Sequence, residues 1–227
     1  MAEIVDDPEL RNKIHVFKDR FHAGDLLTDK LVEFRGREDV LVLAIPAGGV
    51  QVASRIAEKL KLPLDVLVTR KLHIPWNREA GFGAVTWDGF ALFNEPLVAS
   101  LGLTDDEIRE VVAYERAEIE RRLRLFRGER PLPELNGKSL IVVDDGLASG
   151  FSMLATLRSL RSKEARKIIV AVPTAPVSAI ELLKPHADVI VCLNIRSGPV
   201  FAVADAYKLW YDLTDEEVVD LLKKTKY

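Results

Sequence analysis

The sequence contains very few cysteines, histidines and side-chain amides. Cys192 is the only cysteine among 227 residues, so no internal disulfide can form, which fits a reducing compartment. The four histidines lie far apart and lack the spacing of a metal site: His15, His22, His73 and His186. Asparagine occurs five times and glutamine once, whereas Glu, Lys and Arg are abundant. This composition predicts a thermophilic source.

The sequence also lacks long apolar runs and a concentration of charge of one sign. No apolar run approaches the ~20 residues of a membrane span, so no membrane association is expected. The acidic and polar start, MAEIVDDPEL, has no apolar signal core, and we expect a cytoplasmic protein. The formal net charge is −3 and the basic residues are scattered, which argues against a nucleic-acid partner.

Five short apolar runs alternate with segments of helical spacing. The runs cover residues 40–45, 64–68, 140–143, 167–172 and 189–193. The helical segments are expected at 19–34, 50–60, 104–127, 151–162 and 176–184, and from residue 215. This order predicts an α/β fold, with a doubly wound, mostly parallel five-stranded sheet flanked by helices.

The length favours a single domain over residues 1–227. We expect its core at about 38–195 and a small hood formed by the termini, at about 1–37 and 196–227. A short strand is expected at 13–18. Residues 70–89 combine Pro, Gly, Trp and charges without a clear period, which predicts a long mobile loop or a hairpin.

Residues 140–152, LIVVDDGLASGFS, carry the clearest chemical pattern. A buried strand ends in two carboxylates, and a turn of small residues then opens a helix. Ligands of open α/β sheets lie outside the carboxyl ends of the strands. The turn can direct several backbone N–H groups at one phosphate, assisted by the helix N-terminus. Asp144 and Asp145 repel a phosphate but can accept hydrogen bonds from a diol or help to hold hydrated Mg²⁺. A sugar phosphate satisfies both halves of the pattern.

This segment resembles the signature of the type I phosphoribosyltransferases, in which an apolar strand, two acidic residues and a small-Ser/Thr-Gly loop follow one another. The resemblance implies that Asp144 and Asp145 hold the ribose hydroxyls of phosphoribosyl pyrophosphate. It also implies that the loop beyond them wraps the 5-phosphate with Ala148, Ser149, Gly150, Phe151 and Ser152, and that Gly146 and Leu147 contribute to donor binding.

Two further segments match the family in order and spacing. IPAGG, with Ala47, Gly48 and Gly49, takes the place of the pyrophosphate loop. Arg70 and Lys71 resemble the basic pair that faces the pyrophosphate, and residues 72–83, with Arg78 and Glu79, resemble the flexible loop that closes over the site. The segments FKDRFHAG, IPAGGV, TRKLHIP and WYDLTDEEV together resemble a microbial subgroup of this family.

The sequence departs from the family pattern at three positions. Gly146 replaces the usual branched aliphatic residue, and Ala47 replaces an arginine found in many relatives. Ala148 stands where 6-oxopurine enzymes often carry an aspartate, so the chain looks more like the adenine or orotate branches.

The expected activity is transfer of the 5-phosphoribosyl group to a nitrogenous base, with release of pyrophosphate. Asp144, Asp145 and Lys71 are the expected catalytic residues. Mg²⁺ is the expected cofactor, held indirectly by Asp144 and Asp145. The resemblance to the family also implies a homodimer. Two alternative functions stay open: a regulator that binds the donor without catalysis, and an enzyme that hydrolyses the donor. The aromatic residues Phe201, Trp210 and Tyr211 could stack on a base or pack on the core. His73 is expected at the surface, and Cys192 in the core.

Overall fold

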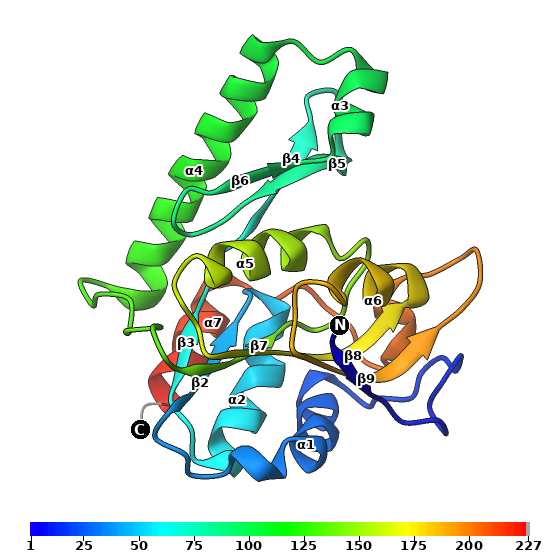
Figure 1. Ribbon diagram of the computed structural model, residues 1–227, viewed down its shortest axis with the longest axis vertical. Helices are drawn as coiled ribbons and strands as arrows, with labels where there is room; N and C mark the ends of the chain where they lie inside the picture. The colour runs from blue at the N-terminus through cyan, green and yellow to red at the C-terminus, as the bar shows by residue number, and fades with distance from the viewer. Residues whose placement is uncertain (226–227) are drawn as a thin grey trace.

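A computed structural model, which describes residues 1–225, has a six-stranded parallel sheet at its centre (Figure 1). The strands lie in the order β1 (Glu3–Val5), β9 (Val189–Arg196), β8 (Lys167–Pro176), β7 (Ser139–Val143), β2 (Val40–Ala44) and β3 (Leu64–Val66). Every neighbouring pair is parallel. The expected α/β fold is therefore confirmed.

The expected number of five strands is wrong, because β1 pairs with the free edge of β9 and adds a sixth. Residues 3–5, which we expected in the hood, thus lie in the central sheet. The strand expected at 13–18 does not form; only an isolated bridge joins Phe17 to Tyr207. Residues 226 and 227, at the end of the expected hood, lie outside the described residues.

Helices cover both faces of the sheet (Figure 1). The face below the sheet in that view carries α1 (Arg20–Lys30) and α2 (Gly48–Leu60), and the opposite face carries α5 (Phe151–Arg161) and α6 (Val177–Leu183). Helix α7 (Asp215–Lys224) lies near β3 and packs against α2. Short 3-10 helices follow α1 (Val32–Phe34) and precede the C-terminal segment (Val203–Ala206). The Asp19 side chain accepts a hydrogen bond from the backbone N–H of His22 and caps α1, as the sequence predicts.

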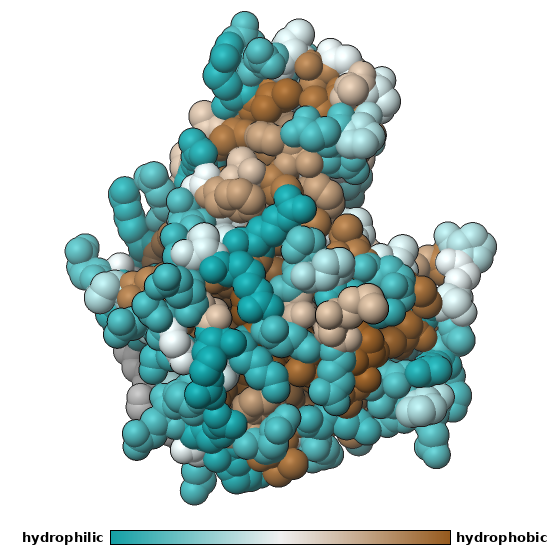
Figure 2. Space-filling view, viewed as in Figure 1, coloured by the Kyte–Doolittle hydropathy of each residue, from teal (hydrophilic) through white to brown (hydrophobic). Residues whose placement is uncertain are grey.

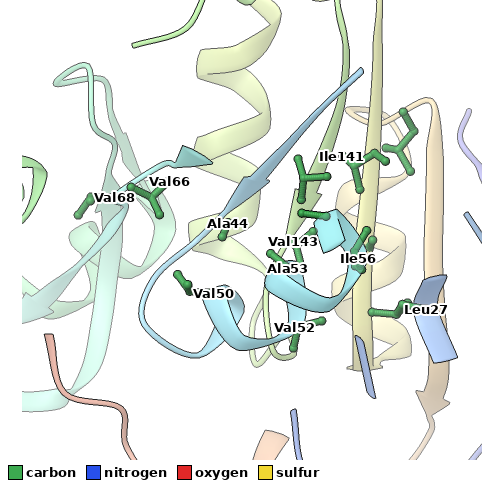
Figure 3. Packing of buried hydrophobic residues seen from close by; sticks show 14 of the residues in the cluster. Leu27, Ala44, Val50, Val52, Ala53, Ile56, Val66, Val68, Ile141 and Val143 are labelled. Atoms are coloured by element: carbon green, nitrogen blue, oxygen red, sulfur yellow. The ribbon is translucent and has the colours of Figure 1, made fainter. Parts of the chain in front are cut away.

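The alternation of side chains along each strand divides the core into two layers. In β2, Val40, Val42 and Ala44 pack with α1 and α2, whereas Leu41 and Leu43 pack with α5 and α6. Figure 3 shows the first layer, with α2 side chains directed at β2 and β7. This two-sided burial explains why the strands are continuous apolar runs.

Residues 70–127 form a unit that extends away from one end of the sheet, here called the projecting unit (Figure 1). A three-stranded antiparallel sheet, with β4 (Arg70–Ile74), β5 (Asn77–Val85) and β6 (Ala91–Phe93), precedes α3 (Glu95–Leu101) and the long helix α4 (Asp105–Arg127). Of the two expectations for residues 70–89, the hairpin is confirmed. Apolar side chains are visible on this unit in Figure 2, and α3 has no fully buried residue.

The strand order reverses between β2 and β7. From β2 the chain moves outward to β3, and it later returns to the other side of β2 and continues through β7, β8 and β9. The loops at the carboxyl ends of β2 and β7 therefore flank a topological switch point, the place where open α/β sheets bind ligands. Within residues 1–225, none of the helices has the length and apolarity needed to cross a membrane.

Candidate active site at the switch point

The acidic pair lies directly beyond β7. Asp144 and Asp145 are half-buried, and the backbone N–H of Asp145 donates to Oδ1 of Asp144 over 2.8 Å. The pKa of the Asp144 carboxyl is raised well above its ordinary value, because burial disfavours the charged form and the charge of Asp145 lies beside it. Burial also raises the pKa of Asp145, and the positive charge of Arg20 opposes that rise.

Asp144 is expected to reduce stability at neutral pH in the protein without bound ligands. Its ordinary pKa is 3.8 and its folded pKa is higher, so the folded state holds more protons than the unfolded state over the interval between them. Stability therefore falls as pH rises from 3.8 through the folded pKa. Asp144→Asn removes this cost and should raise the melting temperature at pH 7. Thermal melts from pH 3.5 to 8 should show the gain shrinking towards acid pH; a gain independent of pH would contradict the account.

The glycine loop after β2 packs against the acidic pair. A Cβ on Gly48 would lie 1.8 Å from Oδ2 of Asp145, and one on Gly49 would lie 2.8 Å from the carbonyl oxygen of Val143. Only glycine leaves the space for these contacts. Ala47 precedes α2 with helical torsions, and the Pro46–Ala47 peptide bond is cis. The two loops that the sequence predicts to share a ligand are thus in direct contact.

The loop from Gly146 to Ser152 turns from the acidic pair into α5. Ala148 and Ser149 are exposed, and Oγ of Ser149 accepts a hydrogen bond from the N–H of Phe151 over 3.3 Å. Gly150, at φ 77°, precedes the helix and has no side chain to cap it, so apart from the N–H of Phe151 the first turn keeps N–H groups for an anion. Leu147 differs from the rest, because its side chain is buried in the core.

The missing side chain at Gly146 has a structural explanation. A Cβ there would lie 2.5 Å from Cγ1 of Val203 and 3.0 Å from Cγ2 of Thr174. Val203, in the 3-10 helix before the C-terminal segment, thus fills the space into which a side chain at position 146 would extend. The departure from the family pattern at Gly146 therefore leaves no gap beside this turn.

Arg20, at the start of α1, binds Asp145. Its side chain is 4% exposed, its Nε lies 2.7 Å from Oδ2 of Asp145, and an Nη donates to the carbonyl oxygen of Tyr211 over 2.8 Å. The guanidinium group lies 3.8 Å from the centre of the Trp210 ring, close enough for a cation–π contact. Arg20 therefore joins the acidic loop to the C-terminal segment.

The C-terminal segment from Tyr207 to Tyr211 lies beside the acidic loop. The buried Tyr207 hydroxyl donates to the carbonyl oxygen of Asp145 over 2.5 Å, and the Gln51 amide donates to the Tyr211 hydroxyl over 3.0 Å. Trp210 is 37% and Tyr211 is 50% exposed. Part of the expected hood therefore lies against the predicted ribose site, with aromatic surface free for a further ligand.

A basic pocket of about 210 Å³ separates the glycine loop from the projecting unit. Arg70 and Lys71, predicted to face pyrophosphate, line it beside Pro46. Its other lining residues are Thr69, His73, Arg78, Tyr114, Glu115 and Arg122. Nζ of Lys71 donates to the carbonyl oxygen of Glu79 over 2.5 Å. A larger cavity, of about 700 Å³, lies between α1, α2 and α7, and none of its lining residues is a predicted site residue.

The acidic pair fits a magnesium ion that is shared with a substrate. Within residues 1–225, no three His, Cys, Asp or Glu side chains are grouped to hold a metal by themselves. Mg²⁺ retains several waters and commonly binds through one or two carboxylates together with substrate phosphates. Asp144 and Asp145 suit that role, in which the ion would neutralise charge on the phosphates.

Several residues of this site were not predicted from the sequence. Arg20 lies within the FKDRFHAG segment, but only its neighbour Asp19 gave a signal, as a helix cap. Glu115 and Arg122 belong to a highly charged helix in which nothing sets them apart. His73, expected at the surface, is half-buried and lies 3.0 Å from Glu115.

Comparisons with known proteins match most of this chain. The family described as "Phosphoribosyl transferase domain" matches residues 19–210. Two Mycobacterium tuberculosis proteins, "Putative phosphoribosyl transferase Rv0571c" of strain H37Rv and "Putative phosphoribosyl transferase MT0597" of strain CDC 1551, are each 36% identical over 209 residues, which are 92% of this chain and 47% of theirs. The chain thus spans about half the length of these curated relatives.

A solved structure extends the similarity to the fold. The crystal structure of TT1426 from Thermus thermophilus superposes with a TM-score of 0.75 at 34% identity, covering 93% of this chain and 99% of that one. Together with the match over residues 19–210, this confirms the resemblance found in the sequence. The chain belongs to the phosphoribosyl transferase domain family.

Proposed function

We propose that this protein transfers the 5-phosphoribosyl group from phosphoribosyl pyrophosphate to a nitrogenous base, of the nucleobase class, and releases pyrophosphate. The observation that carries the proposal is the convergence of three different surfaces at one switch point. These are the two carboxylates after β7, the start of α5, and the glycine loop after β2, which touches the carboxylates and adjoins a basic pocket. A donor with a diol, a 5-phosphate and a pyrophosphate has a counterpart for each surface.

Each surface receives one part of the donor. Asp144 and Asp145 accept hydrogen bonds from the ribose hydroxyls and tolerate positive charge that develops on the ring. The N–H groups from Gly146 to Ser152 bind the 5-phosphate at the start of α5. Gly48 and Gly49, with the N–H groups around Ala47, allow the pyrophosphate to approach the backbone closely. Arg70 and Lys71 neutralise charge on that leaving group.

The acceptor base is proposed to lie against the C-terminal segment. The exposed parts of Trp210 and Tyr211 offer aromatic surface within reach of Asp145, because Arg20 contacts all three residues. A planar base suits such a surface. The β4–β5 hairpin, with Arg78 and Glu79, would close over the donor and exclude water, which competes with the base as acceptor. We also propose that the protein is a homodimer and has no nucleic-acid partner. Light scattering would test the homodimer.

The test is mass spectrometry of the products. The protein is incubated with Mg²⁺, phosphoribosyl pyrophosphate and a pooled panel of purines and pyrimidines. A new nucleotide establishes the transfer and names the base. Loss of donor above the no-protein control, without any nucleotide, contradicts transfer to these bases and favours hydrolysis. An intact donor that nevertheless binds favours a regulator.

A further inference from the structure

The basic pocket carries more positive charge than its predicted residues supply. Four basic side chains line it, those of Arg70, Lys71, Arg78 and Arg122, against one carboxylate, that of Glu115. Its volume of about 210 Å³ is below the ~300 Å³ at which pockets for drug-sized ligands begin. Both features suit a small polyanion.

Glu115 holds two residues of the pocket in place from the opposite wall. This α4 residue is 2% exposed, and its two carboxylate oxygens are used separately. Oε2 accepts from Nε of Arg70 over 2.7 Å, and Oε1 lies 3.0 Å from Nδ1 of His73. Both partners belong to β4, so one buried carboxylate fixes the β4 side chains that line the pocket.

Arg122 lies about two turns further along α4 and has an unused donor. Its Nε is closed to solvent and has no hydrogen-bond partner among residues 1–225. One Nη lies 3.3 Å from Oδ1 of Asp215, at the start of α7. Burial lowers the pKa of this guanidinium. The side chain as a whole is 22% exposed and lines the basic pocket, so its charge acts on an anion bound there.

We propose that Arg122 is a ligand of the pyrophosphate group, and that Glu115 is the positioning residue that holds Arg70 and His73 towards the same anion. The assignment of the anion rests on the proposed function. The pocket is then built by two elements far apart in the sequence, β4 and α4, which the projecting unit brings together. Arg122 supplies a charge-assisted hydrogen bond, and Glu115 supplies geometry.

The first experiment compares two adjacent arginines. Arg121 and Arg122 both pair with Asp215, but only Arg122 lines the pocket. Binding of inorganic pyrophosphate, with and without Mg²⁺, is measured by calorimetry for Arg122→Gln and Arg121→Gln. Arg122→Gln should weaken binding by about tenfold to a hundredfold, the value of a hydrogen bond to a charged group, whereas Arg121→Gln should stay near wild type. Equal effects of the two variants would overturn the assignment of Arg122.

The second experiment asks whether Glu115→Gln weakens or tightens pyrophosphate binding. Removing a carboxylate from an anion pocket should by charge alone tighten pyrophosphate binding. If Glu115 positions Arg70 and His73, then Glu115→Gln should weaken binding about tenfold. Glu118→Gln, which removes a carboxylate that is 29% exposed and paired with Arg121 on the same helix, is the control. Unchanged or tighter binding by a folded Glu115→Gln protein would overturn the positioning role.

Nucleotide formation by the wild-type protein, measured in parallel, separates this inference from the proposed function. If the wild type forms a nucleotide but Arg122→Gln binds pyrophosphate normally, the inference fails and the function stands. If pyrophosphate binding depends on Arg122 but no nucleotide forms, the ligand assignment stands and transferase activity fails. A wild type that binds no pyrophosphate under either condition overturns the inference.

Discussion

Asp145→Asn should reduce phosphoribosyl transfer about 10²- to 10³-fold, the typical loss when one preorganised electrostatic contact to a reacting group is removed. The proposed role of Asp145 is to accept a ribose hydroxyl and to place negative charge near a ring that becomes positive. An amide keeps the shape and one acceptor oxygen but loses the charge. Turnover should fall more than donor affinity, because the charge acts mainly on the transition state. Steady-state kinetics with the base identified by mass spectrometry would measure both quantities.

Asp106→Asn provides the control for this variant. Asp106 is an aspartate in the first turn of α4, with a side chain 89% exposed and paired with Arg109. Its replacement should leave kcat and KM unchanged. Near-normal turnover by a folded Asp145→Asn protein would remove Asp145 from the mechanism, whatever its effect on stability.

The sequence predicts the central fold well because strands buried on both faces of a parallel sheet consist of consecutive apolar residues, and such runs can be recognised in the sequence. Each interior strand contains a continuous apolar run, such as residues 40–44 in β2 and 140–143 in β7. β1 shows no such run: it has three residues, EIV, of which the first is charged, and Asp6 and Asp7 follow it. It forms a strand because it pairs with the edge of β9. The N-terminal part of the expected hood was misplaced for the same reason.

The projecting unit was only partly predictable. Residues 70–89 lack a regular apolar period because the β4–β5 hairpin has irregular register and relies on glycines for close contacts. A Cβ on Gly81 would lie 2.4 Å from Cγ of Lys71, and one on Gly83 would lie 2.4 Å from the carbonyl oxygen of Leu92. Such contacts exist only once the strands are paired, so the sequence could indicate a hairpin or a loop but not choose between them.

The residues of the candidate site also fall into a group that the sequence predicts and a group that only the tertiary structure reveals. The acidic pair and the glycine loops follow directly from strands, so their chemistry can be recognised from consecutive residues. Arg20, Glu115 and Arg122 act through partners more than forty residues away: Asp145, Arg70 and Asp215. Each is a common charged residue in a charged segment, and only tertiary structure buries it. Residues of this kind neutralise or orient the residues that can be recognised from the sequence. Arg20, Glu115 and Arg122 were therefore not predicted.

Replacing Arg20 should cause a large loss of stability. Arg20→Met leaves the carboxylate of Asp145, 16% exposed, without its cation, and breaking a buried pair in this way costs about 3–5 kcal/mol. The variant also loses the hydrogen bond to Tyr211 and the stacking on Trp210, so the C-terminal segment should loosen. For a chain of this size, we expect the melting temperature to fall by roughly 10 °C. Differential scanning calorimetry would measure the change.

A double-mutant cycle then separates the ion pair from these other contacts. In Arg20→Met with Asp145→Asn, no charge is left unpaired, so the double variant should be more stable than the sum of the single losses predicts, by about 1–3 kcal/mol. Arg20→Lys should lie between wild type and Arg20→Met, because it keeps the charge but lacks the planar fork that reaches Asp145 and Tyr211 together. Additive losses would mean that Arg20 acts through Trp210 and Tyr211 rather than through Asp145. Coupled losses would mean that the fold itself maintains a cation against the carboxylate on which the proposed chemistry depends.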